Sequence, residues 1–180
     1  VVSQLNEYLG AMTNIVFEHE GTLDKFVGDE IVAFWGAPLD QPDHAERAVR
    51  CALAMIRKLE ELQKRWAAQG KHVIDTGVGI KTGEMIVGNM GAEGKKMDFT
   101  VIGDNVNLGA RVEGLTRQYN NHIIITEFTY AKVKDIVNAK ELGSVTVKGK
   151  QRPVVVYDLL GGASSPGGDR PADLQLKEAR

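Results

Sequence analysis

The sequence contains a single cysteine, so no disulfide can form within the chain. Cys51 lies among apolar residues at helical spacing, and we therefore expect it to be a buried thiol. No apolar run approaches the roughly 20 residues that span a bilayer, and no signal peptide is visible. These absences predict a soluble, cytoplasmic chain that is stabilised by its core alone.

Neither sign of charge is in excess, because 22 Lys and Arg residues face 24 Asp and Glu residues and the net charge is -2. Such a balance argues against an extended surface for nucleic acid or for lipid headgroups. Contact with phosphate groups would instead depend on a few placed cations. The sequence also has no internal repeat, no Ser/His/Asp or Cys/His nucleophilic set, and no histidine spacing suited to zinc.

The hydrophobic periodicity predicts one α+β domain, with helices over one largely antiparallel sheet, followed by a tail. The expected helices cover residues 2–20, 43–70, 105–117 and 127–137, with Asp43 and Glu46 as a capping box before the second. The expected strands cover residues 22–35 as a hairpin, 73–80 and 84–90 joined at residues 81–83, 98–102, 123–126, 145–148 and 154–159. The domain therefore spans residues 1–160. Residues 161–180 are rich in Gly, Pro and Ser, then charged, which predicts a disordered tail or linker.

The hairpin at residues 22–35, TLDKFVGDEIVAFW, is the centre of the sequence argument. Gly28 at the first of two loop positions suits a type II′ turn, and the apolar arms should be at least half buried. Asp29 could hold a divalent cation, although Asp is also an ordinary turn residue. Lys25 could donate to a base or a phosphate, although such a residue is most often a solvated lysine that protects a strand edge.

The stretch TVIGDNVNLGAR at residues 100–111 predicts a strand, a glycine break and a helix that begins after Asp104. Asn107 and Arg111 are four residues apart and so share one helical face, where they could hold a sugar and a phosphate. The alternative is an exposed polar face without function. The start of the helix would also favour an anion.

A second cationic candidate is Lys148 in VKGK, residues 147–150, which predicts a hairpin tip suited to a polyphosphate. Lysine-rich surface turns are common, so this signal is weak alone. Residues 91–96 resemble a phosphate loop but lack the GxxxxGK[ST] spacing.

Taken together, DKFVGDEIVAFWGAP, DFTVIGDNVNLGARVE and VTVKGKQRPVVVY resemble the motifs of class III nucleotide cyclase catalytic domains in order and spacing. The resemblance covers about residues 1–160 and is greatest to the bacterial adenylate cyclases that carry Thr at one base-reading position. It implies a palm-type, ferredoxin-like fold. It also implies conversion of ATP to 3′,5′-cyclic AMP and pyrophosphate with two divalent cations, Mg²⁺ or Mn²⁺, in cyclic-nucleotide signalling.

The resemblance assigns Lys25 and Thr100 to the adenine edge and Ile102 to a place beside the purine. A lysine can donate to the ring nitrogen that accepts in adenine, whereas guanine carries a proton there. Guanylate cyclases of this family typically have Glu at the position of Lys25. The substrate implied is therefore ATP.

The other implied roles concern the ribose, the phosphates and the metals. Asn107 would orient the ribose, Arg111 would stabilise charge on the α-phosphate, and Lys148 would bind the terminal phosphates. Asp29 matches the second of the family's two metal aspartates. The first lies in a strand before the first helix, and the sequence, which starts inside that helix, contains no match to it. In this family the metal aspartates and the Asn/Arg/Lys set of one site come from different protomers, so a homodimer is implied.

Two rival functions remain open on the sequence. VGDE resembles the GGDEF hairpin of diguanylate cyclases, but Val27 replaces the first glycine, and a second set at Asn107 and Arg111 is not expected there. The other rival is a non-catalytic cyclase-homology module that dimerises or senses a nucleotide. Either a catalytic or a sensory domain could serve as the output domain of a larger sensor protein.

Overall fold

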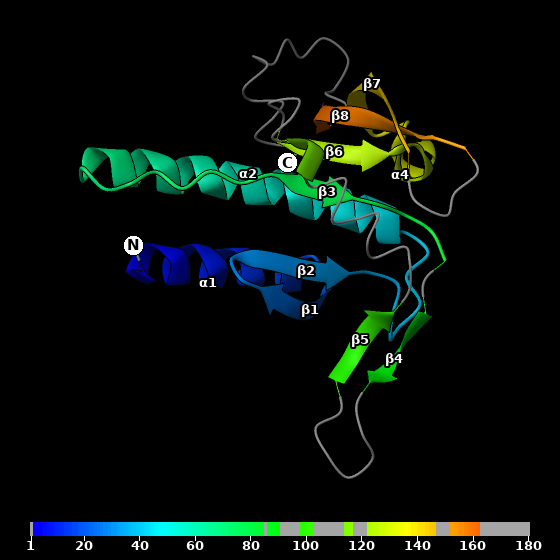
Figure 1. Cartoon of the computed structure of the whole chain (residues 1–180), viewed down its shortest axis with the longest axis horizontal. Coiled ribbons are helices and arrows are strands. Elements are labelled where there is room, and N and C mark those ends of the chain that lie inside the picture. Colours follow the sequence, from blue (N-terminus) through cyan, green and yellow to red (C-terminus); the bar gives the residue numbers. More distant parts are fainter. Residues whose placement is uncertain are drawn as a thin grey trace.

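The computed structural model of the chain describes residues 2–84, 86–90, 98–102, 114–116, 122–146 and 152–162. The helices are α1 (Val2–Glu18), α2 (His44–Ala68) and α4 (Glu127–Val133). The strands are β1 (Thr22–Val27), β2 (Glu30–Phe34), β3 (Val78–Ile80), β4 (Ile86–Met90), β5 (Asp98–Ile102), β6 (Ile123–Thr126), β7 (Val137–Val145) and β8 (Val154–Gly162). Helices combined with antiparallel-rich sheets confirm the α+β class and the palm-type fold predicted from the sequence (Figure 1).

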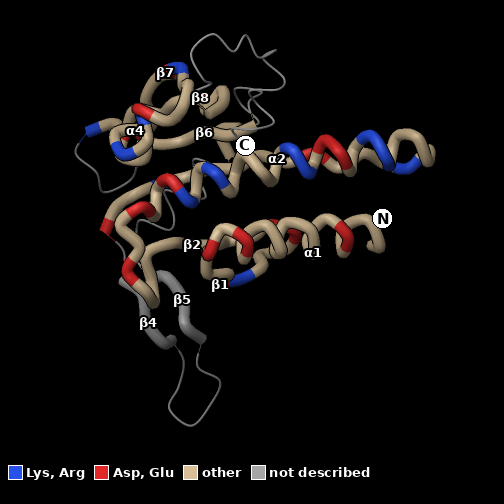
Figure 2. Tube along the Cα trace, turned by 180° about the vertical axis from the view of Figure 1, so that it is seen from behind, with Lys and Arg blue, Asp and Glu red and all other residues tan. Residues whose placement is uncertain are grey.

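Helices α1 and α2 lie side by side and run in opposite directions (Figure 1). Two ion pairs join their opposite ends. Arg47 binds Glu20 at 2.8 Å just beyond the end of α1, and Arg65 in the last turn of α2 binds Glu7 near the start of α1. Figure 2 shows both signs of charge distributed along α2, as expected for a helix with one solvated face.

The strands form three separate sheets in the described residues, where the sequence predicted one. Strands β1 and β2 form an antiparallel hairpin, β4 and β5 form a second, and the third sheet has the order β3-β6-β8-β7. Within that sheet β3 pairs with β6 in parallel, whereas β6 and β7 both pair with β8 in antiparallel fashion. The strands predicted over 73–80 and 84–90 follow one another in the chain as β3 and β4, but they belong to different sheets and do not pair.

Strand β6 is one of the two central strands of the four-stranded sheet, and all four of its residues are buried. Ile123 and Ile125 belong to the main core, which also contains the buried faces of α1 and α2. Ile124, pointing to the other face, belongs to a smaller cluster with Val156 and Leu115. Burial on both faces explains why this strand is a continuous apolar run rather than an alternating one.

Several element boundaries differ from the predictions, and β8 continues to Gly162, past its predicted end at residue 159. Helix α4 ends at Val133, because strand β7 begins at Val137, well before the predicted start at residue 145. Of the strand predicted over 73–80, only Val78–Ile80 is a strand in the structure. The capping box is also wrong: Asp43 makes no side-chain cap hydrogen bond and instead accepts one of 2.7 Å from Arg47 Nε.

Cys51 is buried on α2, as predicted, and burial raises the pKa of its thiol to about 12. Such a thiol stays protonated at neutral pH and is unreactive. None of the helices in the described part of the chain is both long and apolar enough to cross a membrane. The predicted tail falls almost wholly outside the described residues, which end at residue 162.

Candidate active site

Four hydrogen bonds fix the base of the β1–β2 hairpin, and two of them connect it to residues 19 and 20, directly after α1. Trp35 Nε1 donates to the His19 carbonyl at 2.9 Å, and Thr22 Oγ1 donates to the Ala37 carbonyl at 2.9 Å. Gln41 bridges the two segments, because its Oε1 accepts from the Gly36 amide at 2.8 Å and its Nε2 donates to the Glu20 carbonyl at 3.1 Å. The hairpin therefore projects from a rigid base.

The turn of the hairpin has the predicted geometry. Val27 pairs with Glu30, which leaves Gly28 and Asp29 as the two loop residues. Gly28 has φ +62°, whereas Asp29 is not among the described residues with positive φ. A positive φ at the first loop position alone is the pattern of a type II′ turn. The Asp29 carboxylate is thus exposed at a conformationally defined tip.

The predicted burial of both hairpin arms is wrong for the end of β1. Phe26 is 49% exposed and Val27 is 53% exposed, although β2 is half to fully buried along its length. The apolar sequence misled the prediction, since apolar side chains near a tip are covered only where another element reaches them. Two exposed apolar side chains therefore lie close to Asp29 in the sequence, one on each face of the hairpin.

Lys25 lies on β1 opposite Val32, and its side chain is 46% exposed. Its ammonium Nζ lies 3.7 Å from Asp24 Oδ2, and the Asp24 side chain is only 1% exposed. Asp24 did not enter the candidate site from the sequence. The signal was present, since Asp24 and Lys25 are adjacent opposite charges in an apolar strand, but adjacent strand residues ordinarily point to opposite faces.

Strand β5 carries the two other candidates for the nucleotide base. Thr100 pairs with Gly88 of β4 and Ile102 pairs with Ile86. Strand β5 also lies against β1. The strand of Lys25 and the strand of Thr100 are therefore neighbours in the structure, although about 75 residues separate them in the sequence.

Asn107, Arg111 and Lys148 lie outside the described residues, so their predicted roles stay predictions. Among the described residues there is no group of three or more His, Cys, Asp or Glu side chains that could enclose a metal ion. Asp29 makes no ion pair within this part of the chain. Its carboxylate is free to serve as one hard oxygen ligand of a shared site.

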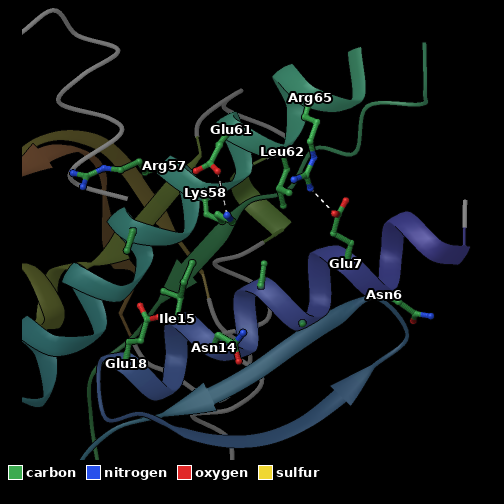
Figure 3. Close-up of a pocket in the computed structure, with 13 residues that line it drawn as sticks. Asn6, Glu7, Asn14, Ile15, Glu18, Arg57, Lys58, Glu61, Leu62 and Arg65 are labelled. Carbon is green, nitrogen blue, oxygen red and sulfur yellow. Dashed lines mark hydrogen bonds and ion pairs between the residues drawn. The ribbon is translucent and has the colours of Figure 1, made fainter. Parts of the chain in front are cut away.

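A groove of about 640 Å³ lies between α1 and α2 and contains none of the predicted site residues. Figure 3 shows that its rim is charged and that two of its cations are already paired. Arg65 binds Glu7, and Lys58 binds Glu61 at 3.2 Å. The groove is a seam between two helices, and part of its charge is neutralised by these two pairs.

The family described as "Adenylate and Guanylate cyclase catalytic domain" matches residues 1–161 of this sequence. The chain is similar to adenylate cyclase 1 of Rhizobium meliloti, with 35% identity over 161 residues, covering 89% of the chain and 24% of the relative. It is also 35% identical to the terminal-differentiation specific adenylate cyclase of Dictyostelium discoideum, covering 90% of the chain and 8% of that relative. The chain therefore spans at most about a quarter of these relatives' lengths.

Solved structures of both nucleotide specificities resemble the chain. The guanylyl cyclase Cya2 superposes with a TM-score of 0.80 at 36% identity, covering 92% of this chain and 83% of that one. The adenylyl cyclase CyaB from P. aeruginosa superposes with a TM-score of 0.78 at 38% identity, covering 88% of this chain and 81% of that one. Overall similarity thus identifies the kind of catalytic domain but does not separate ATP from GTP as substrate.

Proposed function

The chain belongs to the family of adenylate and guanylate cyclase catalytic domains, and from this premise we propose that it is an adenylate cyclase. The reaction converts ATP to 3′,5′-cyclic AMP and pyrophosphate. The ribose 3′-oxygen loses its proton and bonds to the α-phosphorus, while the bond from that phosphorus to the pyrophosphate oxygen breaks. Such a transfer depends on positioning and on charge stabilisation, and it needs no protein nucleophile.

The observation that carries the choice of ATP is the position of Lys25. Lys25 has a half-exposed side chain and lies on β1, a strand that contacts β5, the strand that carries Thr100. A lysine ammonium has three donors and no acceptor, so it suits the unprotonated ring nitrogen of adenine and repels the corresponding N–H of guanine. Lys25 and Thr100 would together read the adenine edge, with Ile102 beside the purine.

The remaining residues would act on the sugar and the phosphates. Asn107 orients the ribose, so that the 3′-hydroxyl faces the α-phosphorus. Arg111 stabilises the negative charge that develops on the transferring phosphate, and Lys148 holds the terminal phosphates. These three roles follow from the motif positions in the family.

Asp29 fits a metal-binding role in its chemistry, because it offers hard oxygen donors at an exposed, defined turn without a competing ion pair in the described residues. Two divalent cations, when bound, lower the pKa of the ribose 3′-hydroxyl and neutralise the triphosphate. Asp29 would supply one ligand. The exposed position of the hairpin tip leaves room for other ligands and for the nucleotide.

The active assembly would be a homodimer with two sites at its interface. Phe26 and Val27, exposed beside Asp29, support this arrangement, because apolar side chains near a functional group are typical of an interface. In such a dimer Asp29 of one protomer would face Arg111 of the other. The family relation is the reason for the proposal, and the exposed tip is its structural support.

The direct test is product analysis with ATP and with GTP in the presence of Mg²⁺ or Mn²⁺, followed by chromatography. We expect 3′,5′-cyclic AMP from ATP and little product from GTP. Lys25→Glu should reduce turnover of ATP at least tenfold, whereas Lys64→Glu, a charge reversal at an exposed site on α2, should leave it unchanged.

Other products would overturn the proposal in different ways. Cyclic GMP as the main product would make the chain a guanylate cyclase, and a cyclic dinucleotide would assign it to the diguanylate cyclases. Binding of ATP without turnover, together with unchanged ATP binding in Lys25→Glu, would indicate a nucleotide-binding or dimerisation module.

A further inference from the structure

Strand β1 contains a β-bulge at Asp24. Leu23 pairs with Ala33 and Lys25 pairs with Val32, so two steps along β1 match one step along β2. Asp24 is the extra residue and has no partner on β2. Bulges of this kind bend the strand and redirect side chains, and they are common beside active sites. Here the bulge brings the side chains of two consecutive residues together.

The Asp24 side chain is almost completely removed from solvent, at 1% exposure. Neither of its carboxylate oxygens has a hydrogen-bond partner within the described residues. The cation that faces it there is the Lys25 ammonium, 3.7 Å from Oδ2. Burying a carboxylate without hydrogen bonds is unfavourable. Packing alone therefore does not explain why Asp24 is buried next to a half-exposed lysine.

The geometry supplies such a reason. A lysine side chain is long and flexible, and its ammonium has three equivalent donors. A carboxylate fixed behind the ammonium attracts one of these donors and leaves the others directed outward, where Lys25 is exposed. The attraction is effective because Asp24 is shielded from water and salt.

We propose that Asp24 is a positioning residue for substrate recognition, and that the group reading the adenine is a Lys25–Asp24 pair rather than a lysine alone. This inference rests on the proposed role of Lys25. Asp24 keeps the ammonium aimed at the base, and it does not itself touch the nucleotide. Its removal should therefore weaken binding of ATP and leave binding of GTP unchanged.

The experiment is a double-mutant cycle read by calorimetric titration of ATP and of GTP, with Ca²⁺ as the metal. We expect Asp24→Asn to weaken ATP binding roughly tenfold and Lys25→Ala to weaken it at least as much. Asp24→Asn added to Lys25→Ala should cause no further loss. Asp40→Asn, at an exposed acidic residue in the loop after β2, serves as the matched control and should bind ATP like the unmodified protein.

The outcomes separate this inference from the proposed function. An equal loss from Asp24→Asn with and without Lys25 would show a purely structural role and overturn the pair. The pair would also be overturned if Asp24→Asn reduced the affinities for ATP and GTP equally, or if it reduced neither. If Lys25→Ala itself leaves ATP binding unchanged, both the base-reading role and the pair are wrong. If the cycle shows coupling but no cyclic AMP is formed from ATP, the pair stands and the proposed activity fails.

Discussion

The indole Nε1 of Trp66 donates a 2.9 Å hydrogen bond to the Glu7 carboxylate, which joins the last turns of α2 to the first half of α1. The Trp66 side chain is 1% exposed, so the bond lies at the border between core and solvent. The Trp66 indole, helped by the Arg65 guanidinium, holds the pKa of Glu7 below its ordinary value. The Trp66–Glu7 hydrogen bond thus holds α1 and α2 together.

The first prediction concerns the pH dependence of this hydrogen bond. A lowered pKa in the folded state means that the Glu7 charge stabilises the fold above the unfolded-state pKa, and that this stabilisation is lost as pH falls through the folded-state value. Glu7→Gln should therefore lower Tm at pH 7, and the difference should be smaller at pH 3, because lowering the pH neutralises Glu7 in the folded protein. Thermal melting at both pH values checks this. Glu46→Gln, which breaks only a surface pair with Arg50, should change Tm little at either pH. A Tm difference for Glu7→Gln that is as large at pH 3 as at pH 7 would contradict the role of the charge.

The second prediction uses one substitution at two glycines of the same region. A Cβ at Gly10, inside α1, would meet nothing within 4 Å, so Gly10→Ala should raise the free energy of unfolding by about 0.5–1 kcal/mol through helix propensity. A Cβ at Gly21 would lie 2.7 Å from the Trp35 ring and 2.8 Å from Val16 Cγ1. Gly21→Ala should therefore lower the free energy of unfolding by about 1–3 kcal/mol. Urea denaturation measures both values, and effects of the same sign would refute the packing described at Gly21.

The predictable part of the fold is the part in which local pattern and tertiary packing agree. The apolar stripes of α1 and α2 gave both helices to within about two residues, and Gly28 gave the turn type. Strand β7 begins eight residues before its predicted start. The prediction missed this part because the polar positions around Lys140 do not alternate with buried ones. What aligns it is pairing with β8, a contact between distant segments that local pattern does not contain.

For the candidate site, the sequence could single out residues but not their surroundings. Lys25 and Asp29 stood out because they are charged residues in an apolar hairpin; the structure shows that both are exposed, and their roles stay predictions. The bulge at Asp24 could not be derived, because register shifts depend on how two strands settle against the core. The exposure of Phe26 was also missed, since an apolar residue looks the same in a core and at an interface.

The third prediction concerns a buried chain of hydroxyl groups at the start of α4. Thr129 Oγ1 lies 2.8 Å from Thr82 Oγ1 and 3.3 Å from Thr126 Oγ1. Thr129→Val keeps the shape but leaves the other two hydroxyls without this partner, which should cost about 1–3 kcal/mol of unfolding free energy. Chemical denaturation checks the value. Thr76→Val, at an irregular segment before β3, is the control and should cost under 0.5 kcal/mol. Equal losses would show that the hydroxyl chain contributes nothing specific.

The last prediction tests whether each site is shared between two protomers. In the proposed dimer, Asp29 of one protomer and Arg111 of its partner complete one site, so Asp29→Asn and Arg111→Ala proteins should each be inactive alone. Half of the dimers in an equal mixture are heterodimers, and each of these has one intact site and one doubly damaged site. The mixture should therefore recover about a quarter of the unmodified activity per protomer.

The matched control for this experiment is a mixture of Lys25→Glu and Arg111→Ala proteins. Lys25 and Arg111 would come from the same protomer in each site, so both sites of the heterodimer carry a defect and no activity should return. Cyclic AMP formation after mixing, with sedimentation to confirm exchange of protomers, measures both cases. Recovery in both mixtures would place all of these residues differently from the proposal. If the mixture of Asp29→Asn and Arg111→Ala proteins stays inactive although protomers exchange, Asp29 and Arg111 act within one chain. The exposed residues Phe26 and Val27 at the hairpin tip would then not serve to complete a shared site.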